Sequence, residues 1–228
     1  GMSGRFAAAV TCRLMGIQSE AGVTGDVAEI GTFEGRFFIA LAKAMAQSER
    51  ALGLDLFDWP DREVEDRFKS NCARHGLDAE RAMGWRADSR TLSAAALAEK
   101  LGGRRLRLFH IDGEHSRASL AGDLSLASSQ MTAGGLIVLD DMLHPGYPTL
   151  IVTVLEFLAS HPAWTVLCVI DRESIVAASK LVLCETAWFK RYETALMSAL
   201  PDNIWPLGAH FEPHWCLVLA LDTQLAKT

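Results

Sequence analysis

Two acidic segments carry the residue types best suited to chemistry. Asp112 follows an apolar run that ends at Ile111, and Asp140 and Asp141 follow the apolar run 136–139. If these runs are neighbouring parallel strands, their carboxyl ends meet at one edge of a sheet and the three carboxylates converge. Carboxylates that close repel one another, and a hard divalent cation such as magnesium would relieve the repulsion. Ligand types alone leave calcium, manganese or a histidine-assisted transition metal open.

Proton-accepting side chains stand beside these acids. Glu114 and His115 follow Asp112 within three residues, and either could take a proton from a substrate hydroxyl as general base. A cation at the cluster would lower the pKa of that hydroxyl. The second segment ends at His144, which is a further candidate base if no metal is used. His110 falls inside an apolar run, and this favours a buried histidine with a structural role. The predicted catalytic residues are Asp112, Glu114 and His115.

A glycine-containing turn joins a predicted strand to a predicted helix. Its glycines, Gly31 and Gly35, are spaced GxxxG and lack the GxGxxG pattern of a dinucleotide-binding turn. Phe33 and Arg36 stand where such a turn needs glycine beside a pyrophosphate, which disfavours a nicotinamide-dependent oxidoreductase. Glu29 adds a negative charge that suits a cationic ligand. The alternative is a pair of ordinary turn glycines with no ligand.

Acids also end the next two apolar runs. Asp55 stands 20 residues after Gly35, where a carboxylate can accept hydrogen bonds from both hydroxyls of a ribose. Asp88 and Ser89 follow the third run, where an adenine edge would lie. Each of these acids could instead cap the helix that follows it.

Together these motifs resemble class I S-adenosylmethionine (SAM)-dependent methyltransferases, and most closely methyltransferase family 24 with its macrocin and catechol O-methyltransferase relatives. The resemblance covers about residues 26–180. It implies that Glu29 and Gly31 face the methionine end of the cofactor, that Asp55 binds its ribose and that Asp88 binds the adenine amino group. It also implies a metal triad. The residues predicted to bind cofactor are Glu29, Gly31, Thr32, Phe33, Gly35, Asp55, Leu56, Asp88, Ser89 and Asp112, and the predicted metal ligands are Asp112, Asp140 and Asp141.

The resemblance implies methyl transfer to the hydroxyl of a small molecule, with magnesium at the acidic cluster. Catechol-type members use a lysine near the position of Glu114 and His115, so this chain departs from that pattern. Two alternatives stay open: a metal-independent methyltransferase with a histidine base, and a non-catalytic module for cofactor binding or oligomerisation.

The elements that would position these residues follow a βα alternation. Short apolar strands are predicted at 27–30, 51–54, 82–86, 106–111 and 136–139, separated by helices at about 35–47, 61–74, 92–101 and 117–131. A helix near 148–160 and a hairpin of strands 165–170 and 174–178 follow. The pattern predicts an α/β fold: a Rossmann-like three-layer sandwich whose mostly parallel, seven-stranded sheet ends in an antiparallel hairpin.

Three parts are expected along the chain. Residues 1–25 are predicted to form a capping helix, residues 26–180 the SAM-binding domain, and residues 181–228 a C-terminal extension packed on that domain. The extension contains a predicted helix at 187–200, a loop with Pro201, Pro206 and Pro213, and an apolar strand at 215–221. Its many aromatic residues suit internal packing, a dimer contact or substrate selection.

Composition limits the partners. The 228 residues include 22 basic and 28 acidic side chains, for a net charge of −6, and no basic block is present, so a nucleic-acid partner is not expected. No run of about 20 apolar residues predicts a membrane span. Five scattered cysteines without a CxxC pair are typical of free thiols in a reducing compartment, so a cytoplasmic location is expected. A homo-oligomer is possible.

Overall fold

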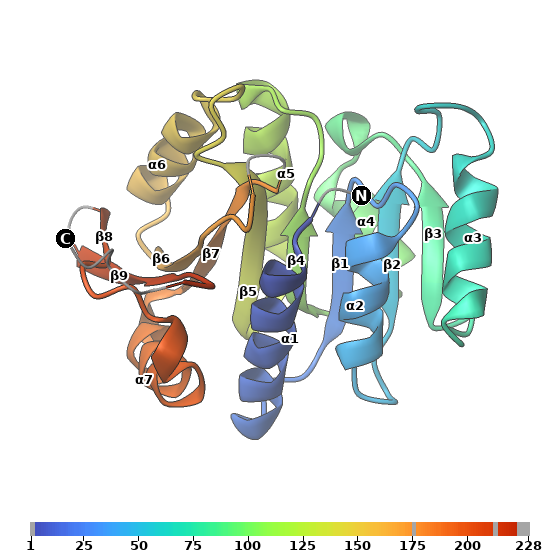
Figure 1. The fold of residues 1–228 in the computed structure, drawn as a ribbon. Coiled ribbons are helices and arrows are strands. Elements are labelled where there is room, and N and C mark those ends of the chain that lie inside the picture. The colour runs from blue at the N-terminus through green and yellow to red at the C-terminus, as the bar shows by residue number, and fades with distance from the viewer. Residues whose placement is uncertain (1–2, 175–176, 212–213, 223–228) are drawn as a thin grey trace.

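The computed structural model describes residues 3–174, 177–211 and 214–222, and these contain one nine-stranded sheet of order β3-β2-β1-β4-β5-β7-β6-β9-β8 (Figure 1). Its strands are β1 Asp26–Ile30, β2 Ala51–Asp55, β3 Ala82–Arg86, β4 Leu106–Ile111, β5 Met131–Met142, β6 Trp164–Ile170, β7 Ser179–Glu185, β8 Ala209–Phe211 and β9 His214–Leu219.

The first five strands are parallel, and the direction of strand order reverses between β1 and β4. Both of these strands are buried along their whole length, because helices cover both faces of the sheet. In open α/β sheets the ligand crevice lies outside the carboxyl ends of the strands at such a reversal. A ligand crevice is therefore expected at the carboxyl ends of β1 and β4, and of β2 and β5 beside them.

Helices pack against the sheet in two outer layers (Figure 1). One face carries α1, α2, α3 and α7, and the other carries α4, α5 and α6. The bounds are α1 Arg5–Glu20, α2 Arg36–Ala44, α3 Val64–Arg74, α4 Ala94–Lys100, α5 Arg117–Gln130, α6 Leu150–Ser160 and α7 Phe189–Ala199. No helix in the described ranges is both long and apolar enough to cross a membrane.

The position of α1 is fixed by a buried cation of the sheet. Arg107 is wholly buried in β4, pairs with Glu49 at 2.7 Å and donates a hydrogen bond of 2.8 Å to the carbonyl of Met15. Gln18 donates in return to the carbonyl of Arg107 at 2.7 Å. These contacts hold α1 along the sheet so that the residues just before it, at Ser3, reach the edge where β5 ends.

The predicted fold class is confirmed: seven strands form the mostly parallel sheet with an antiparallel hairpin, and the C-terminal extension adds β9 and β8 at its edge. The predicted position of the second hairpin strand was wrong. It was expected at 174–178, of which residues 175 and 176 lie outside the described ranges, but the strand is β7 at Ser179–Glu185. β7 inserts between β5 and β6 and is antiparallel to both. The expected division between residues 180 and 181 falls inside this strand.

The C-terminal extension follows its predicted helix and strand closely, as α7 and β9. The loop predicted between them instead contains the short strand β8, which pairs with β9. Pro213 of that predicted loop lies outside the described residues.

Candidate functional site

A cleft lies over the carboxyl ends of β1, β2, β4 and β5. It consists of two adjoining cavities whose walls share Gly31, Asp55, Trp59, Asp112 and His115. The first, called here the acidic cavity, measures about 370 Å³ and is also lined by Ser3, Phe33, Asp140, Asp141 and Ala178. The second, called the β2 cavity, measures about 540 Å³ and is also lined by residues that include Leu56, Asp88, Ser89 and Glu114. The two cavities together gather most of the predicted site residues.

The motif glycines are required by packing within the protein. Gly31 has φ of 81°, and a Cβ atom there would lie 1.7 Å from the carbonyl oxygen of Asp112. The amide of Asp112 donates to the carbonyl of Ile30 at 2.9 Å, so the ends of β1 and β4 are in direct contact. Gly35 has φ of 88°, and its Cβ would lie 2.8 Å from the ring of Phe68. These glycines therefore have a steric role within the protein, and Gly31 also lines both cavities, so its predicted contact with the cofactor stays a prediction.

We expect Gly31→Ala to lower the free energy of unfolding by about 3 kcal/mol or more, because it combines a backbone clash with a left-handed conformation. Urea denaturation followed by circular dichroism measures the change. Gly122→Ala is the matched control, since it sits within α5 and a Cβ atom added there would meet nothing within 4 Å. Equal stability of Gly31→Ala and wild type would contradict the steric account.

Asp55, at the end of β2, holds two strained turns, one after β1 and one after β2. One carboxylate oxygen accepts the amide of Phe33 at 2.6 Å and the other accepts the amide of Phe57 at 2.7 Å. Both phenylalanines have φ of 50°, in the left-handed region that side chains rarely adopt. Strain that the surroundings maintain is common where a loop must present groups to a ligand. Each oxygen keeps further capacity to accept a hydroxyl hydrogen.

The other predicted cofactor residues differ in their access to the cleft. Thr32 is buried and its hydroxyl donates to the carbonyl of Leu54 at 3.4 Å, so its visible role is local. Asp88 lines the β2 cavity but pairs with Arg90 at 2.8 Å and caps the short turn after it. The hydrogen bond from Arg90 lowers the pKa of Asp88. Leu56 is 43% exposed and presents an apolar wall to the same cavity.

Asp112, His115 and Asp141 come together in the acidic cavity, where one ligand atom from each lies within 4.8 Å of the others. His115 Nε2 is 2.5 Å from Asp141 Oδ2. Asp141 itself has φ of 56°, so its backbone is held in a strained conformation at the end of β5. Burial, followed by the charge of Asp140, raises the pKa of Asp112 well above its usual range. The cluster is therefore short of positive charge.

Asp140, the third predicted metal ligand, is engaged by a lysine that sequence analysis missed. Asp140 Oδ2 contacts the ammonium of Lys180 from β7, and Asp140 Oδ1 accepts the amide of Asp141 at 2.8 Å. Burial raises the pKa of Asp140, but Lys180, His110 and the amide of Asp141 together lower it to about 2. Asp140 lines the acidic cavity beside Asp112 and Asp141, but its carboxylate already has a resident ammonium partner.

Glu29 and His110 continue this buried network. His110 Nε2 lies 3.0 Å from the Lys180 ammonium, and His110 Nδ1 lies 2.7 Å from Glu29 Oε1. Because an ammonium only donates, Nε2 must accept and the ring proton sits on Nδ1, directed at Glu29. Burial and then Lys180 lower the pKa of His110 well below its usual value, which keeps the ring neutral. The prediction that His110 is a buried core histidine is confirmed.

Glu29 is buried and is not among the residues that line the two cavities, and burial raises the pKa of its carboxyl well above the usual range, with Asp112 as the next cause. Its Oε2 has no hydrogen-bond partner among the described residues. A buried polar atom left without a partner is costly, so a ligand that donates to it would gain binding energy.

The two candidate bases have different surroundings. Glu114 is exposed and accepts hydrogen bonds from Ser119 and Ser116, and these two bonds lower its pKa. His115 is half-buried, and its hydrogen bond to Asp141 raises its pKa. A base with a depressed pKa accepts a proton poorly, so the surroundings favour His115.

Aromatic side chains frame the cleft. The His115 ring stacks on Tyr147 with centroids 4.1 Å apart, and His144 stacks on the same tyrosine at 5.0 Å. Trp59 is 71% exposed, lines both cavities and lies 5.5 Å from the Phe33 ring. Neither Trp59 nor Tyr147 was predicted from the sequence as a site residue, because isolated aromatic residues in loops form no recognisable motif.

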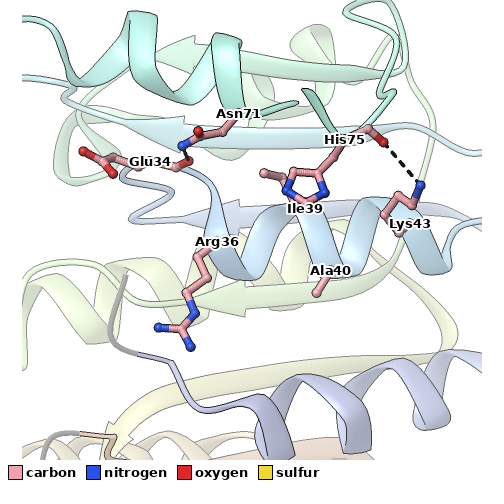
Figure 2. Close-up of a pocket in the computed structure, with 7 residues that line it drawn as sticks. All are labelled: Glu34, Arg36, Ile39, Ala40, Lys43, Asn71 and His75. Carbon is pink, nitrogen blue, oxygen red and sulfur yellow. Dashed lines mark hydrogen bonds between the residues drawn. The ribbon is translucent and has the colours of Figure 1, made fainter. Parts of the chain in front are cut away.

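A further cavity of about 610 Å³ lies outside this cleft, between α2 and α3 (Figure 2). Its polar groups connect the two helices: Asn71 donates to the carbonyl of Glu34 at 2.8 Å, and Lys43 donates to the carbonyl of His75 at 3.3 Å. Arg36 points away from this pair of contacts (Figure 2). The described residues that line this cavity bring no convergent set of reactive groups together, so it is not the candidate site.

The chain resembles known proteins in both sequence family and fold. A family model described as a methyltransferase domain matches residues 28–142, half of the chain. A search of curated proteins finds no match. Among solved structures, the O-methyltransferase NovP has a TM-score of 0.63 at 16% identity, covering 80% of this chain and 81% of its own.

Two further structures carry ligands. The O-methyltransferase TomG from Streptomyces achromogenes, involved in tomaymycin synthesis and in complex with SAM, has a TM-score of 0.56 at 19% identity, covering 77% of this chain and 79% of its own. An O-methyltransferase from Bacillus cereus in complex with SAH has a TM-score of 0.57 at 16% identity, covering 77% of this chain and 80% of its own. At these identities the likeness shows a shared fold.

Proposed function

Because the chain belongs to the family of this methyltransferase domain, we propose that it transfers a methyl group from SAM to a hydroxyl of a small molecule. The observation that carries the proposal is the cleft at the strand reversal, where Asp55 lies at the wall shared by the acidic cavity and the β2 cavity. Such a cleft can hold a long ligand with a ribose at its centre and a cationic group beside carboxylates.

The residues present fit this cofactor. Asp55 offers both oxygens to the ribose hydroxyls, and Leu56 and Ser89 line the β2 cavity, where the adenine would lie. Glu29 Oε2, without a partner among the described side chains, suits a donor such as the ammonium of the methionine moiety. When bound, SAM supplies an electrophilic methyl group on a sulfonium centre.

The acceptor hydroxyl would lie in the acidic cavity, within reach of His115. His115 Nδ1 would accept its proton while Nε2 keeps its contact with Asp141, which orients the ring and stabilises the imidazolium that forms. The stack on Tyr147 fixes the plane of the ring. Positioning of the two reactants in one cleft contributes much of the rate, because the displacement needs an in-line approach.

Asp112 and Asp141 would also hold a divalent cation such as magnesium, which lowers the pKa of a nearby hydroxyl when bound. Their oxygens, with His115, form the one compact ligand group found among the described residues. Asp140 would have to leave Lys180 in order to join them. The second candidate is metal-independent transfer with His115 as base, which the short His115–Asp141 contact favours.

Calorimetric titration of SAM into the purified protein, with magnesium and then with chelator, tests the function. We expect micromolar binding in both conditions, followed by methylation of a member of a hydroxylated-metabolite panel that slows at least tenfold in chelator and recovers with magnesium. A rate indifferent to chelator would select the metal-independent candidate. No binding of SAM in either condition would refute the methyltransferase proposal and leave a cofactor-free module.

A further inference from the structure

Lys180 is a lysine with no exposed surface in the middle of the sheet. Its ammonium contacts Asp140 Oδ2, His110 Nε2 at 3.0 Å and Ser3 Oγ at 3.2 Å. These three partners match the three donors of an ammonium. The ring of Phe37 lies 4.4 Å from the same nitrogen, which adds a cation–π contact.

The surroundings of this ammonium are strongly acidic. Asp112, Asp140 and Asp141 lie at the ends of the adjacent strands β4 and β5. Glu29 of β1 lies opposite His110 of β4, and the two side chains are paired. Several carboxylates in one buried region cannot all ionise without a compensating positive charge. The ammonium of Lys180 supplies that charge from β7, a strand that follows both acidic segments in the sequence.

We propose that Lys180 is the built-in counter-ion of the acidic cluster: it holds Asp140 in place without a metal ion, and it weakens divalent-cation binding by competing for that carboxylate. The inference deepens the proposed function and rests on it for the role of the cation. It explains why Asp140 has a cationic partner within the protein although all three aspartates line the acidic cavity.

The same contact positions the catalytic end of the site. Lys180 fixes Asp140, Asp140 accepts the amide of Asp141, and Asp141 in turn contacts His115. Lys180 is therefore a positioning residue, since it is buried behind Asp140 and acts on the cavity through that side chain. Ser3, just before α1, adds a second donor to Asp140 Oδ2 at 3.0 Å.

The test is manganese binding, measured by calorimetry and by the loss of the electron paramagnetic resonance signal of free Mn²⁺. Lys180→Gln keeps a hydrogen-bond donor but removes the charge, and we expect it to bind Mn²⁺ at least about tenfold more tightly than wild type, because a repelling charge is lost and Asp140 is released. A lysine needed only for structure would give the opposite result, weaker binding. Lys180→Met provides a second variant with the same expected gain.

Two further proteins make the comparison specific. Arg104→Gln removes a cation that pairs with the buried Asp26 at 2.7 Å, at the opposite end of β1 from the cleft, and its Mn²⁺ affinity should equal that of wild type. Lys180→Gln combined with Asp140→Asn should lose the gain. Unchanged or weaker binding in both single Lys180 variants, or a gain that survives Asp140→Asn, overturns the proposal.

Titration of S-adenosylhomocysteine into the same samples separates this inference from the proposed function. A wild-type protein that does not bind it speaks against the methyltransferase proposal, whereas the manganese comparison among the variants still decides the role of Lys180.

Discussion

Replacing His115 with alanine is expected to lower kcat for methyl transfer about 10²- to 10⁴-fold, the usual contribution of a positioned general base. The side chain lies in both cavities, and its Nε2 is 2.5 Å from Asp141. Affinity for SAM, measured by calorimetry, should stay within about threefold, because Asp55 and Glu29 are unaffected. This separation of rate from binding distinguishes a base from a residue that shapes the cleft.

Glu114→Gln is the matched control for this prediction. Glu114 neighbours His115 in sequence and lines the β2 cavity, but Ser116 and Ser119 already occupy its carboxylate. We expect its rate to stay within about threefold of wild type. A large loss in Glu114→Gln together with a small loss in His115→Ala would exchange the two roles.

The pH dependence of the rate should report His115. A general base must be unprotonated, so the rate rises with pH through the pKa of the histidine. Its hydrogen bond to Asp141 raises that pKa, which places the midpoint above the ordinary value of about 6.5. Asp141→Asn removes the charge and should move the midpoint down. A midpoint that is the same in Asp141→Asn and wild type would contradict this assignment.

Replacing Asp55 with alanine is expected to weaken SAM binding at least about 100-fold, a change that calorimetry measures directly. The substitution removes two charge-assisted hydrogen bonds to the ribose, each worth roughly 1.5–3 kcal/mol. It also frees Phe33 and Phe57, whose amides it binds at 2.6 and 2.7 Å, to leave their strained conformations. The floor of the cleft then loses its shape as well as its ligand contacts.

Asp88→Ala provides the contrast. Asp88 also follows a strand and lines the β2 cavity, but Arg90 neutralises it and its carboxylate caps a turn. We expect a loss of SAM affinity of no more than about fivefold. Equal effects of the two substitutions would contradict the assignment of Asp55 as the carboxylate that binds the ribose and shapes the cleft.

Local pattern was sufficient to predict much of the fold. The five parallel strands are short apolar runs between helix-like segments, and burial on both faces of the sheet produces such runs. The ends of β2, β4 and β5 could be recognised because an acid follows each apolar run, and the end of β1 because a glycine turn follows it. The clustering of Asp112 with Asp141 then follows from the neighbouring positions of β4 and β5.

The position of β7 could not be predicted in the same way, and Lys180 is the reason. A lysine at the start of an apolar run is typical of the end of a turn, so the strand was expected before it. Burial of that lysine depends on Asp140, His110 and Ser3, which are 40, 70 and 177 residues away in sequence. A lone lysine in a run such as Ser179–Glu185 signals a buried partner, but sequence alone does not identify it.

The placement of β7 also constrains the order in which the protein can form on the ribosome. β6 is synthesised before β7, yet its partners in the described sheet are β7 and β9, so it has no neighbour there when it emerges. Until β7 is synthesised, β5 is an open edge of the sheet, rich in apolar residues and prone to pair with another chain. A nascent or truncated chain ending near residue 142, where the family match ends, would therefore leave this edge bare and Asp140 without its lysine, and chaperone capture or aggregation is the expected fate.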